Sequence, residues 1–185
     1  MWNLIFDDLL LCLNYLPMSL LIGVILSAVL CVAEYFIGKK TIEKQSIVNV
    51  NAILRVCFVT YLLVLLQIVF LSREAGSRDG IDLRIFGTVT GNARGNSYVV
   101  ENILLFIPLG ILIPTVLNKL RSFLSCSVFG FLLSCFIEGA QLLSKRGYCQ
   151  IDDVIMNTVG CGIGFLVWKV MSNRCKNVVD FRNGL

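Results

Sequence analysis

The 185-residue sequence contains no histidine and has few charged residues. Without histidine, the chain cannot form a Ser-His-Asp triad, an HExxH zinc site or a haem site ligated by histidine. Charged residues make up 15% of the chain and hydrophobic residues 57%, whereas typical soluble domains have about 25% and about 45–50%. Together with a mean hydropathy of +0.82, this composition excludes a soluble globular domain and a disordered tail. It indicates an integral membrane protein.

The basic residues bear on a nucleic-acid partner, and the cysteines bear on disulfides and metal sites. Sixteen basic and twelve acidic residues give a formal net charge of +4. The basic residues are dispersed along the chain, so we expect no nucleic-acid partner. The eight cysteines form no Cys-x-x-Cys pair and most lie in apolar runs, where cysteine behaves as a small hydrophobic residue. We therefore expect neither a disulfide framework nor a metal site, and no other cofactor.

Five runs without Asp, Glu, Lys or Arg are the candidate membrane-spanning segments. They cover residues 9–33, 56–72, 102–118, 122–137 and 154–168. Because a helix needs about 17–25 residues to cross a bilayer, the last three runs are short and must recruit flanking residues. Backbone polar groups in lipid must be satisfied within their own segment, so the runs predict helices rather than strands. The predicted fold is all-α, a polytopic membrane bundle of about five transmembrane helices.

The distribution of lysine and arginine predicts the orientation of this bundle. If the N-terminus lies outside, the cytoplasmic connections and the C-terminal end hold ten basic residues, and the outer connections hold six. The N-terminal segment also lacks the basic region and cleavage site of a signal peptide, so we expect the first span to remain as an anchor. We predict a multi-pass protein with its N-terminus outside and its C-terminus in the cytoplasm.

Glu138 is the most informative polar residue in the predicted spans. An ionised carboxylate at membrane depth is costly and usually faces the bundle interior with a partner. Ser134 lies four residues before Glu138 and Gln141 three residues after it, so the three side chains share one helical face. Glu138 can act in a functional site, make a packing hydrogen bond between helices, or lie close enough to the interface to stay hydrated.

A second polar group opens the fifth span. Asp153 and Asn157 are four residues apart and share a helical face. Asp152 and Asp153 also stand at a helix N-terminus, where carboxylates can cap exposed amides and interact favourably with the helix dipole. Below them, Gly160 and Gly164 form a small-residue face together with a cysteine, which predicts close helix packing.

The third span is interrupted by proline, and Glu101 and Asn102 are expected to open it. Pro108 and Pro114 each free a backbone carbonyl, which membrane helices tolerate beside a cavity or a neighbouring helix. Before this span, residues 72–101 are rich in glycine and arginine. We expect this segment to form an ordered loop, a re-entrant cap or a solvated linker.

In the predicted topology, carboxylates, amides and arginines gather at the outer surface. Such a cluster can neutralise itself, bind a phosphorylated lipid head group with or without a divalent cation, or perform acid–base chemistry. The spacing of the residues does not choose among these alternatives. The candidate ligand-binding residues are Arg73, Arg84, Asn102, Glu138, Gln141, Arg146, Asp152, Asp153 and Asn157.

Three motifs follow one another in the second half of the chain. They are Asn-x-x-x-Phe-x-Pro-x-Gly at 102–110, Ser-x-x-x-Glu-x-x-Gln at 134–141, and a third group made of Arg146, Asp152, Asp153, Asn157, Thr158 and Gly160. Over about residues 70–168, this pattern resembles the VanZ-like family of small bacterial membrane proteins. The resemblance predicts a single VanZ-like membrane domain over residues 1–185.

The resemblance implies a role in the bacterial cell envelope, at the plasma membrane. The family takes its name from a protein that gives low-level resistance to teicoplanin, a lipoglycopeptide that binds cell-wall precursors. Our first hypothesis is a non-enzymatic protein whose outer cluster binds an anionic lipid or a lipid-linked cell-wall precursor and so lowers glycopeptide susceptibility. The alternative is an intramembrane enzyme or transporter that acts on a phosphorylated lipid, with Glu138 and Asp152 or Asp153 as acid–base groups or metal ligands. In a third reading, the polar residues only specify helix packing.

Overall fold

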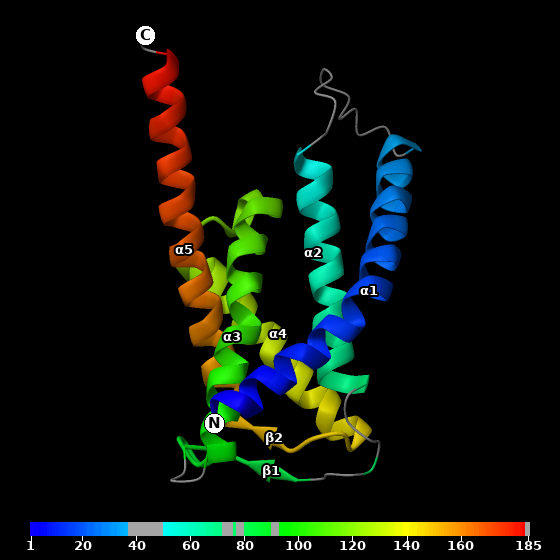
Figure 1. Cartoon of the computed structure of the whole chain (residues 1–185), viewed down its shortest axis with the longest axis vertical. Coiled ribbons are helices and arrows are strands. Elements are labelled where there is room, and N and C mark those ends of the chain that lie inside the picture. Colours follow the sequence, from blue (N-terminus) through cyan, green and yellow to red (C-terminus); the bar gives the residue numbers. More distant parts are fainter. Residues whose placement is uncertain (37–49, 72–75, 77–79, 90–92, 184–185) are drawn as a thin grey trace.

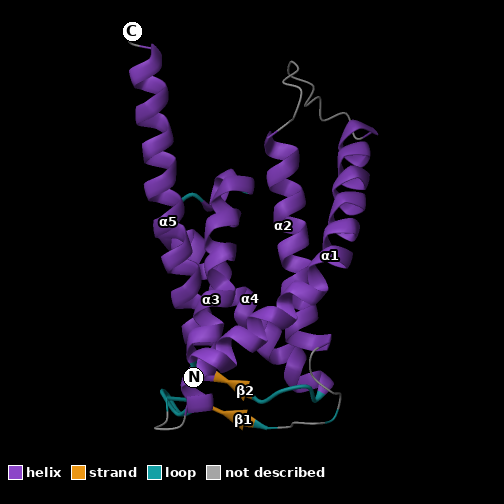
Figure 2. Ribbon diagram, in the orientation of Figure 1, coloured by secondary structure: helices purple, strands orange, loops and turns teal. Residues whose placement is uncertain are grey.

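The computed structural model describes residues 1–36, 50–71, 76, 80–89 and 93–183. Figure 2 shows that helices dominate this part of the chain. Five of them are long and apolar enough to cross a membrane, which confirms the predicted all-α polytopic bundle. In chain order, the elements are α1 (Trp2–Phe36), α2 (Val50–Leu66), a π-helical turn η1 (Gln67–Leu71), β1 (Ile81–Asp82), α3 (Ala93–Val116), a 3₁₀ turn η2 (Asn118–Leu120), α4 (Phe123–Ser144), β2 (Cys149–Gln150) and α5 (Ile151–Asn183).

The five helices alternate in direction, and the N-terminus, β1 and β2 lie together at one end of the bundle (Figure 1). We call this the strand end. The C-terminus lies at the opposite end. Helix α1 runs obliquely in its first half and then beside α2, in keeping with Pro17 inside the helix, since proline kinks helices. Many large apolar side chains of α1 are exposed, as expected for a surface that faces lipid.

Helix α3 begins earlier than the sequence predicts. It starts at Ala93, so Glu101 lies two turns inside the helix. The expectation that Glu101 and Asn102 open the span is therefore wrong. The expectation that residues 72–101 form one connection is wrong for residues 93–101, which are helical. These two turns are stabilised by polar contacts that an apolar run does not reveal. Arg94 forms a 3.2 Å ion pair with Asp8 of α1, and the fully buried Ser97 donates a 2.8 Å hydrogen bond to the Arg94 carbonyl.

A short parallel pairing joins two connections at the strand end. Ile81 of β1 pairs with Cys149 of β2, and the Cys149 amide donates a 2.9 Å hydrogen bond to the Gly80 carbonyl. Gly80 has a φ of 145° and lies against the Tyr148 ring, a backbone conformation that favours glycine. The sequence did not predict these strands. They fasten the described part of the α2–α3 connection to the α4–α5 connection.

Helices α3 and α5 approach each other closely through small residues, as the sequence predicts. A Cβ atom added to Gly160 would clash with the Ile103 carbonyl oxygen, and one added to Gly164 would clash with that of Ile107. Gly110 of α3 lies equally close to the Cys161 backbone. Glycine at membrane-helix interfaces permits this backbone contact, which fixes the position of the polar residues that precede Gly160 on α5.

Backbone carbonyl groups near the prolines of α3 contact side chains of neighbouring helices. Pro114 has no N–H to donate to the Gly110 carbonyl, and the Cys126 Sγ of α4 lies 4.0 Å from that oxygen. Nearer the strand end, the Tyr61 hydroxyl of α2 donates a 2.7 Å hydrogen bond to the Leu105 carbonyl, next to the Leu104 carbonyl that Pro108 leaves free. These contacts connect α3 to α2 and to α4.

The glycine contacts lead to a stability prediction. Gly160→Ala should lower the free energy of unfolding by about 1–3 kcal/mol, because the added methyl group forces α3 and α5 apart. Gly139→Ala is the matched control, since a Cβ at Gly139 meets nothing within 4 Å, and alanine in a helix is favoured over glycine by about 0.5–1 kcal/mol. Unfolding of the purified protein by SDS titration measures both. Equal stability of the two variants would contradict the close α3–α5 approach.

Candidate functional site

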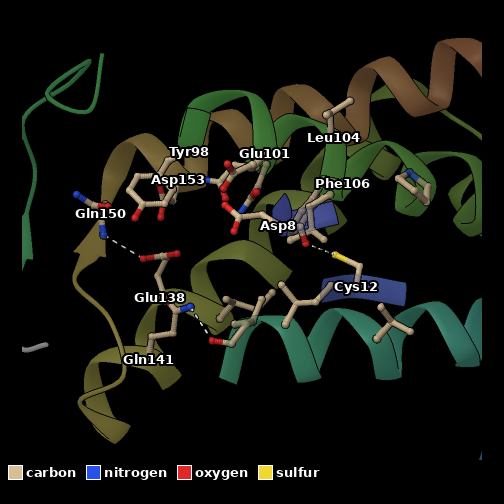
Figure 3. Close-up of a pocket in the computed structure, with 18 of the residues that line it drawn as sticks. Asp8, Cys12, Tyr98, Glu101, Leu104, Phe106, Glu138, Gln141, Gln150 and Asp153 are labelled. Carbon is tan, nitrogen blue, oxygen red and sulfur yellow. Dashed lines mark hydrogen bonds between the residues drawn. The ribbon is translucent and has the colours of Figure 1, made fainter. Parts of the chain in front are cut away.

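A cavity of about 670 Å³ lies among α1 to α4 and the first turns of α5 (Figure 3). It is located at the strand end, because Tyr148 and Gln150 of the α4–α5 connection line it. Apolar side chains form part of its wall; they include Val64, Ile68, Leu104, Phe106 and Ile137. The remaining wall is polar, so the cavity offers both apolar and hydrogen-bonding surface to a ligand.

Four carboxylates line this cavity from four different helices. They are Asp8 of α1, Glu101 of α3, Glu138 of α4 and Asp153 of α5, and Figure 3 shows them around one space. Among the described lining residues, Arg94 is the one basic side chain. In this described part of the lining, acidic side chains therefore outnumber basic ones.

Glu138 and Gln141 bind backbone groups of neighbouring segments. Glu138 is 3% exposed, and its Oε2 accepts a 3.0 Å hydrogen bond from the Gln150 amide of β2. Gln141 is 2% exposed, and its Nε2 donates a 3.2 Å hydrogen bond to the Val69 carbonyl. Ser134 is fully buried, so the three side chains share an interior face of α4 as predicted. The two hydrogen bonds tie α4 to β2 and to η1.

The polar face of α5 binds α3 and α4 through side-chain amides. Asn102 Nδ2 of α3 donates a 2.7 Å hydrogen bond to Asp153 Oδ1. One turn along α5, Asn157 Nδ2 donates a 2.8 Å hydrogen bond to Ser134 Oγ. Asp153 and Asn157 are both buried, which confirms that they share an interior face. Both side chains also line the cavity.

Asp152 turns away from this cavity and stabilises the described loop at 80–89. Its Oδ1 accepts a 2.6 Å hydrogen bond from the Phe86 amide and its Oδ2 a 2.8 Å hydrogen bond from the Thr88 amide. The side chain is 2% exposed, and Phe86 has a positive φ of 60°. Asp152 therefore caps amides as the sequence suggested for one of the two aspartates, but the amides belong to a distant loop and not to its own helix.

The candidate arginines Arg84 and Arg146 are not among the described lining residues of the cavity. Arg84 is 82% exposed and forms a 2.8 Å ion pair with Asp82, and the hydrogen bonds from Arg84 lower the pKa of the Asp82 carboxyl to about 2. Arg146 donates a 2.6 Å hydrogen bond from Nη1 to the Phe70 carbonyl. Arg73 lies outside the described residues. Of the nine candidates, the structure brings five to the cavity: Asn102, Glu138, Gln141, Asp153 and Asn157.

The sequence patterns do not single out several polar residues of the site, among them Asp8, Arg94 and Tyr98. In the structure, Arg94 binds Asp8 and also donates a 3.1 Å hydrogen bond from Nε to the Tyr98 hydroxyl. Arg94, Tyr98 and Glu101 have the i, i+4, i+7 spacing of one helical face. Extending the third helix by two turns would have revealed this face.

Three buried acceptor oxygens of the lining have no hydrogen-bond partner among the described residues. They are Glu101 Oε1, Gln141 Oε1 and Asn157 Oδ1. Buried polar atoms are normally hydrogen-bonded, so each such atom requires an explanation. A ligand or water that donates hydrogen bonds inside the cavity would satisfy them.

Five membrane-length helices with a polar cavity at one end define a polytopic membrane protein with a candidate binding site. Residues 58–172 match the model of the VanZ/LLP1 family. Because the match covers more than half of the chain, the chain belongs to this family, and the resemblance seen in the sequence is confirmed. A single domain over residues 1–185 stays a prediction.

Comparison with curated proteins gives a consistent result. The chain is 37% identical over 92 residues to the protein named Protein VanZ of Enterococcus faecium. The aligned region covers 49% of this chain and 53% of that protein, so the chain spans about half of the length of this relative. No solved structure matches the chain.

The contacts of Asp152 predict a local effect of its substitution. Asp152→Asn should raise amide hydrogen exchange at Phe86 and Thr88 about tenfold, because the new side chain keeps one acceptor oxygen and loses a charge-assisted hydrogen bond worth about 1.5–3 kcal/mol. Exchange measured by mass spectrometry tests this expectation. Asp82→Asn serves as the control, since Asp82 contacts Arg84. Unchanged exchange in Asp152→Asn would show that these amides are held by other contacts.

Proposed function

We propose that this VanZ-family protein acts in the bacterial cell envelope by binding a membrane lipid or a lipid-linked cell-wall precursor in its cavity. Binding would lower susceptibility to glycopeptides such as teicoplanin. The observation that carries the proposal is the cavity of about 670 Å³ with buried polar side chains at the strand end. Cavities of about 300–1,000 Å³ with apolar walls and a few polar groups are typical of small-molecule sites.

The two kinds of surface in the cavity suit an amphiphile. Side chains such as Leu104 and Phe106 can contact an acyl or isoprenoid chain, while Glu138 and Asn157 can accept hydrogen bonds from a head group. Arg94 is the described lining residue suited to a phosphate, because guanidinium groups bind phosphate oxygens through charge-assisted hydrogen bonds. A phosphorylated lipid of the anionic class expected from the sequence therefore has a partner for each of its parts.

The alternative function is an intramembrane enzyme or transporter that acts on a phosphorylated lipid. The observation that favours it is the convergence of carboxylates from four helices on one cavity. Intramembrane carboxylates often carry protons in transport, and paired carboxyl groups can act as general acid and base. Both carboxylate oxygens of Asp152 accept hydrogen bonds from the 80–89 loop. In this alternative, Glu138 and Asp153 are therefore the acid–base groups. Turnover of a lipid pyrophosphate that is lost in Glu138→Gln would support it.

The proposal includes an orientation in which the strand end faces outward. The excess of lysine and arginine in the opposite connections supports a cytoplasmic C-terminus. We expect a C-terminal fusion to green fluorescent protein to fluoresce and a C-terminal fusion to alkaline phosphatase to be inactive. The reverse pattern would place the cavity at the cytoplasmic surface and rule out direct access to an extracellular glycopeptide.

Substitution of Glu138 tests the binding function. Glu138→Gln keeps an acceptor for the Gln150 amide but weakens the hydrogen bonds that the side chain can accept from a head group, so the amount of co-purifying phosphorylated lipid should fall about tenfold, equivalent to about 1.4 kcal/mol. Native mass spectrometry measures the retained lipid. Teicoplanin susceptibility of a bacterium expressing the variant should return toward that of the empty host.

The control for this experiment is Lys119→Gln, which changes one exposed charge in η2 outside the cavity lining. Both variants should be compared at equal expression. If Glu138→Gln lowers thermal stability and leaves lipid retention and teicoplanin susceptibility unchanged, the polar residues serve helix packing and the proposed function is wrong.

A further inference from the structure

The described loop at 80–89 exposes several large apolar side chains. Five of the nine residues from 81 to 89 are large, apolar and between 51% and 67% exposed; they are Ile81, Leu83, Ile85, Phe86 and Val89. Single exposed apolar residues are common on protein surfaces, but a group of them marks a surface that contacts a membrane or another protein. A solvated linker, one of the three forms considered for residues 72–101, has no need of such side chains.

The loop is held at the beginning of two membrane-length helices. Helix α3 starts at Ala93, four residues after Val89, and four residues of chain span about 14 Å at most. At the other end of the loop, β1 pairs with β2, which directly precedes α5. In the middle, Asp152 in the first turn of α5 binds the amides of Phe86 and Thr88. The loop therefore lies at the level where α3 and α5 begin.

The length of α3 and two exposed aromatic residues relate this level to the membrane surface. The 24 residues of α3 measure about 36 Å, so the helix is long enough to extend beyond a hydrocarbon core of about 30 Å. The N-terminus also lies at the strand end (Figure 1), and Trp2 is 70% exposed there. Tyr148 of the α4–α5 connection is exposed as well. Because tryptophan and tyrosine are enriched at membrane–water interfaces, the head-group layer is the partner nearest to the loop.

The backbone of the loop is hydrogen-bonded in the way that a lipid environment requires. Five of its amides have acceptors within the described chain, at N–O distances of 2.6–3.2 Å; they belong to Arg84, Phe86, Gly87, Thr88 and Val89. In water such amides can bind solvent, whereas in lipid an unpaired amide is costly. The internal hydrogen bonds therefore lower the cost of moving the loop from water into the head-group layer.

The charges of the loop are balanced within it. Asp82 and Arg84 are the charged residues between positions 81 and 89, and they form an ion pair with each other. The segment therefore carries no net charge, which removes the cost of transferring an unpaired charge toward lipid. The aliphatic part of Arg84 can also lie along apolar groups while its guanidinium group stays hydrated.

We infer that the 80–89 loop is an interfacial anchor, in which Leu83, Ile85 and Phe86 insert into the head-group layer of the bilayer. The boundary between head groups and acyl chains accepts such side chains from the apolar faces of interfacial helices. The inference does not depend on the proposed function, because none of these three residues belongs to the described lining of the cavity. Through its hydrogen bonds to Asp152, the anchor holds the beginning of α5 at a fixed depth.

Photolabelling of the full-length protein in vesicles tests the anchor. The protein is reconstituted in phosphatidylcholine that includes a phosphatidylcholine with a diazirine near the glycerol end of one acyl chain. A parallel sample receives a water-soluble diazirine on both sides of the membrane. After illumination, mass spectrometry of peptides measures the label on residues 81–89. We expect the lipid probe to label this segment and the water-soluble probe to leave it largely unlabelled.

A pair of double variants assigns the effect to the apolar side chains. Leu83→Ser with Ile85→Ser should lower labelling by the lipid probe about fivefold, because two apolar side chains no longer favour the lipid layer. The matched control is Leu83→Ile with Ile85→Leu, which exchanges the two residues and keeps their apolar surface, so labelling should stay at the wild-type level. Amide hydrogen exchange at Phe86 and Thr88 in detergent should be the same in both variants if the loop remains folded.

Three outcomes would contradict the anchor. Labelling of the wild-type loop by the water-soluble probe alone would show that the loop is solvated. Labelling by neither probe would show that protein covers the loop, and a dimer in native mass spectrometry would then identify a second copy of the chain as the cover. Equal lipid labelling of the serine variant and the wild type would overturn the assignment of Leu83 and Ile85. Each of these results leaves lipid binding in the cavity to be judged separately, from the amount of co-purifying lipid.

Discussion

A polar side chain at membrane depth must find its partner inside the protein, because lipid offers neither donors nor acceptors. The strand end is built around this constraint. Glu138 binds the amide of Gln150, Gln141 binds the carbonyl of Val69, and Asp153 binds the amide group of Asn102. The last two contacts join residues that are 72 and 51 positions apart in the sequence, so satisfying the polar groups also fixes the relative positions of η1, α3, α4 and α5.

Close helix packing makes these hydrogen bonds possible. Gly160 and Gly164 bring the backbone of α5 against the carbonyl groups of α3. This contact determines how far the side chains of Asp153 and Asn157, which lie two turns and one turn before Gly160 on α5, must reach to meet their partners. A bulkier interface would separate α3 from α5 and leave the Asn102–Asp153 pair unsatisfied. The glycine contacts and the polar contacts are therefore two parts of one arrangement.

Much of the fold could be predicted, because membrane spans appear in the sequence as long runs without charged residues. The period of the α-helix also placed Glu138 with Gln141, and Asp153 with Asn157, on interior faces. The start of α3 could not be predicted in the same way, since its first turns are polar and depend on contact between Arg94 and Asp8 of a different helix. The pairing of β1 with β2 involves two residues from each strand, which is too short to give a periodic signal. The predicted topology also grouped Arg84 and Arg146 with the carboxylates, but in the structure Arg84 binds Asp82 and Arg146 binds the Phe70 carbonyl.

The long sequence separation of these contacts has a consequence for membrane insertion during synthesis. Asn102 is separated by 51 residues from its partner Asp153, and Phe86 by 66 residues from Asp152. Chains are synthesised at about 5–20 residues per second, so α3 emerges from the ribosome several seconds before the segment that satisfies its amide. During that interval, α3 carries the polar side chain of Asn102 without its acceptor, and an unsatisfied polar group is costly in lipid. The hydrogen bonds of α3 and of the 80–89 loop can therefore form only after the beginning of α5 has been synthesised.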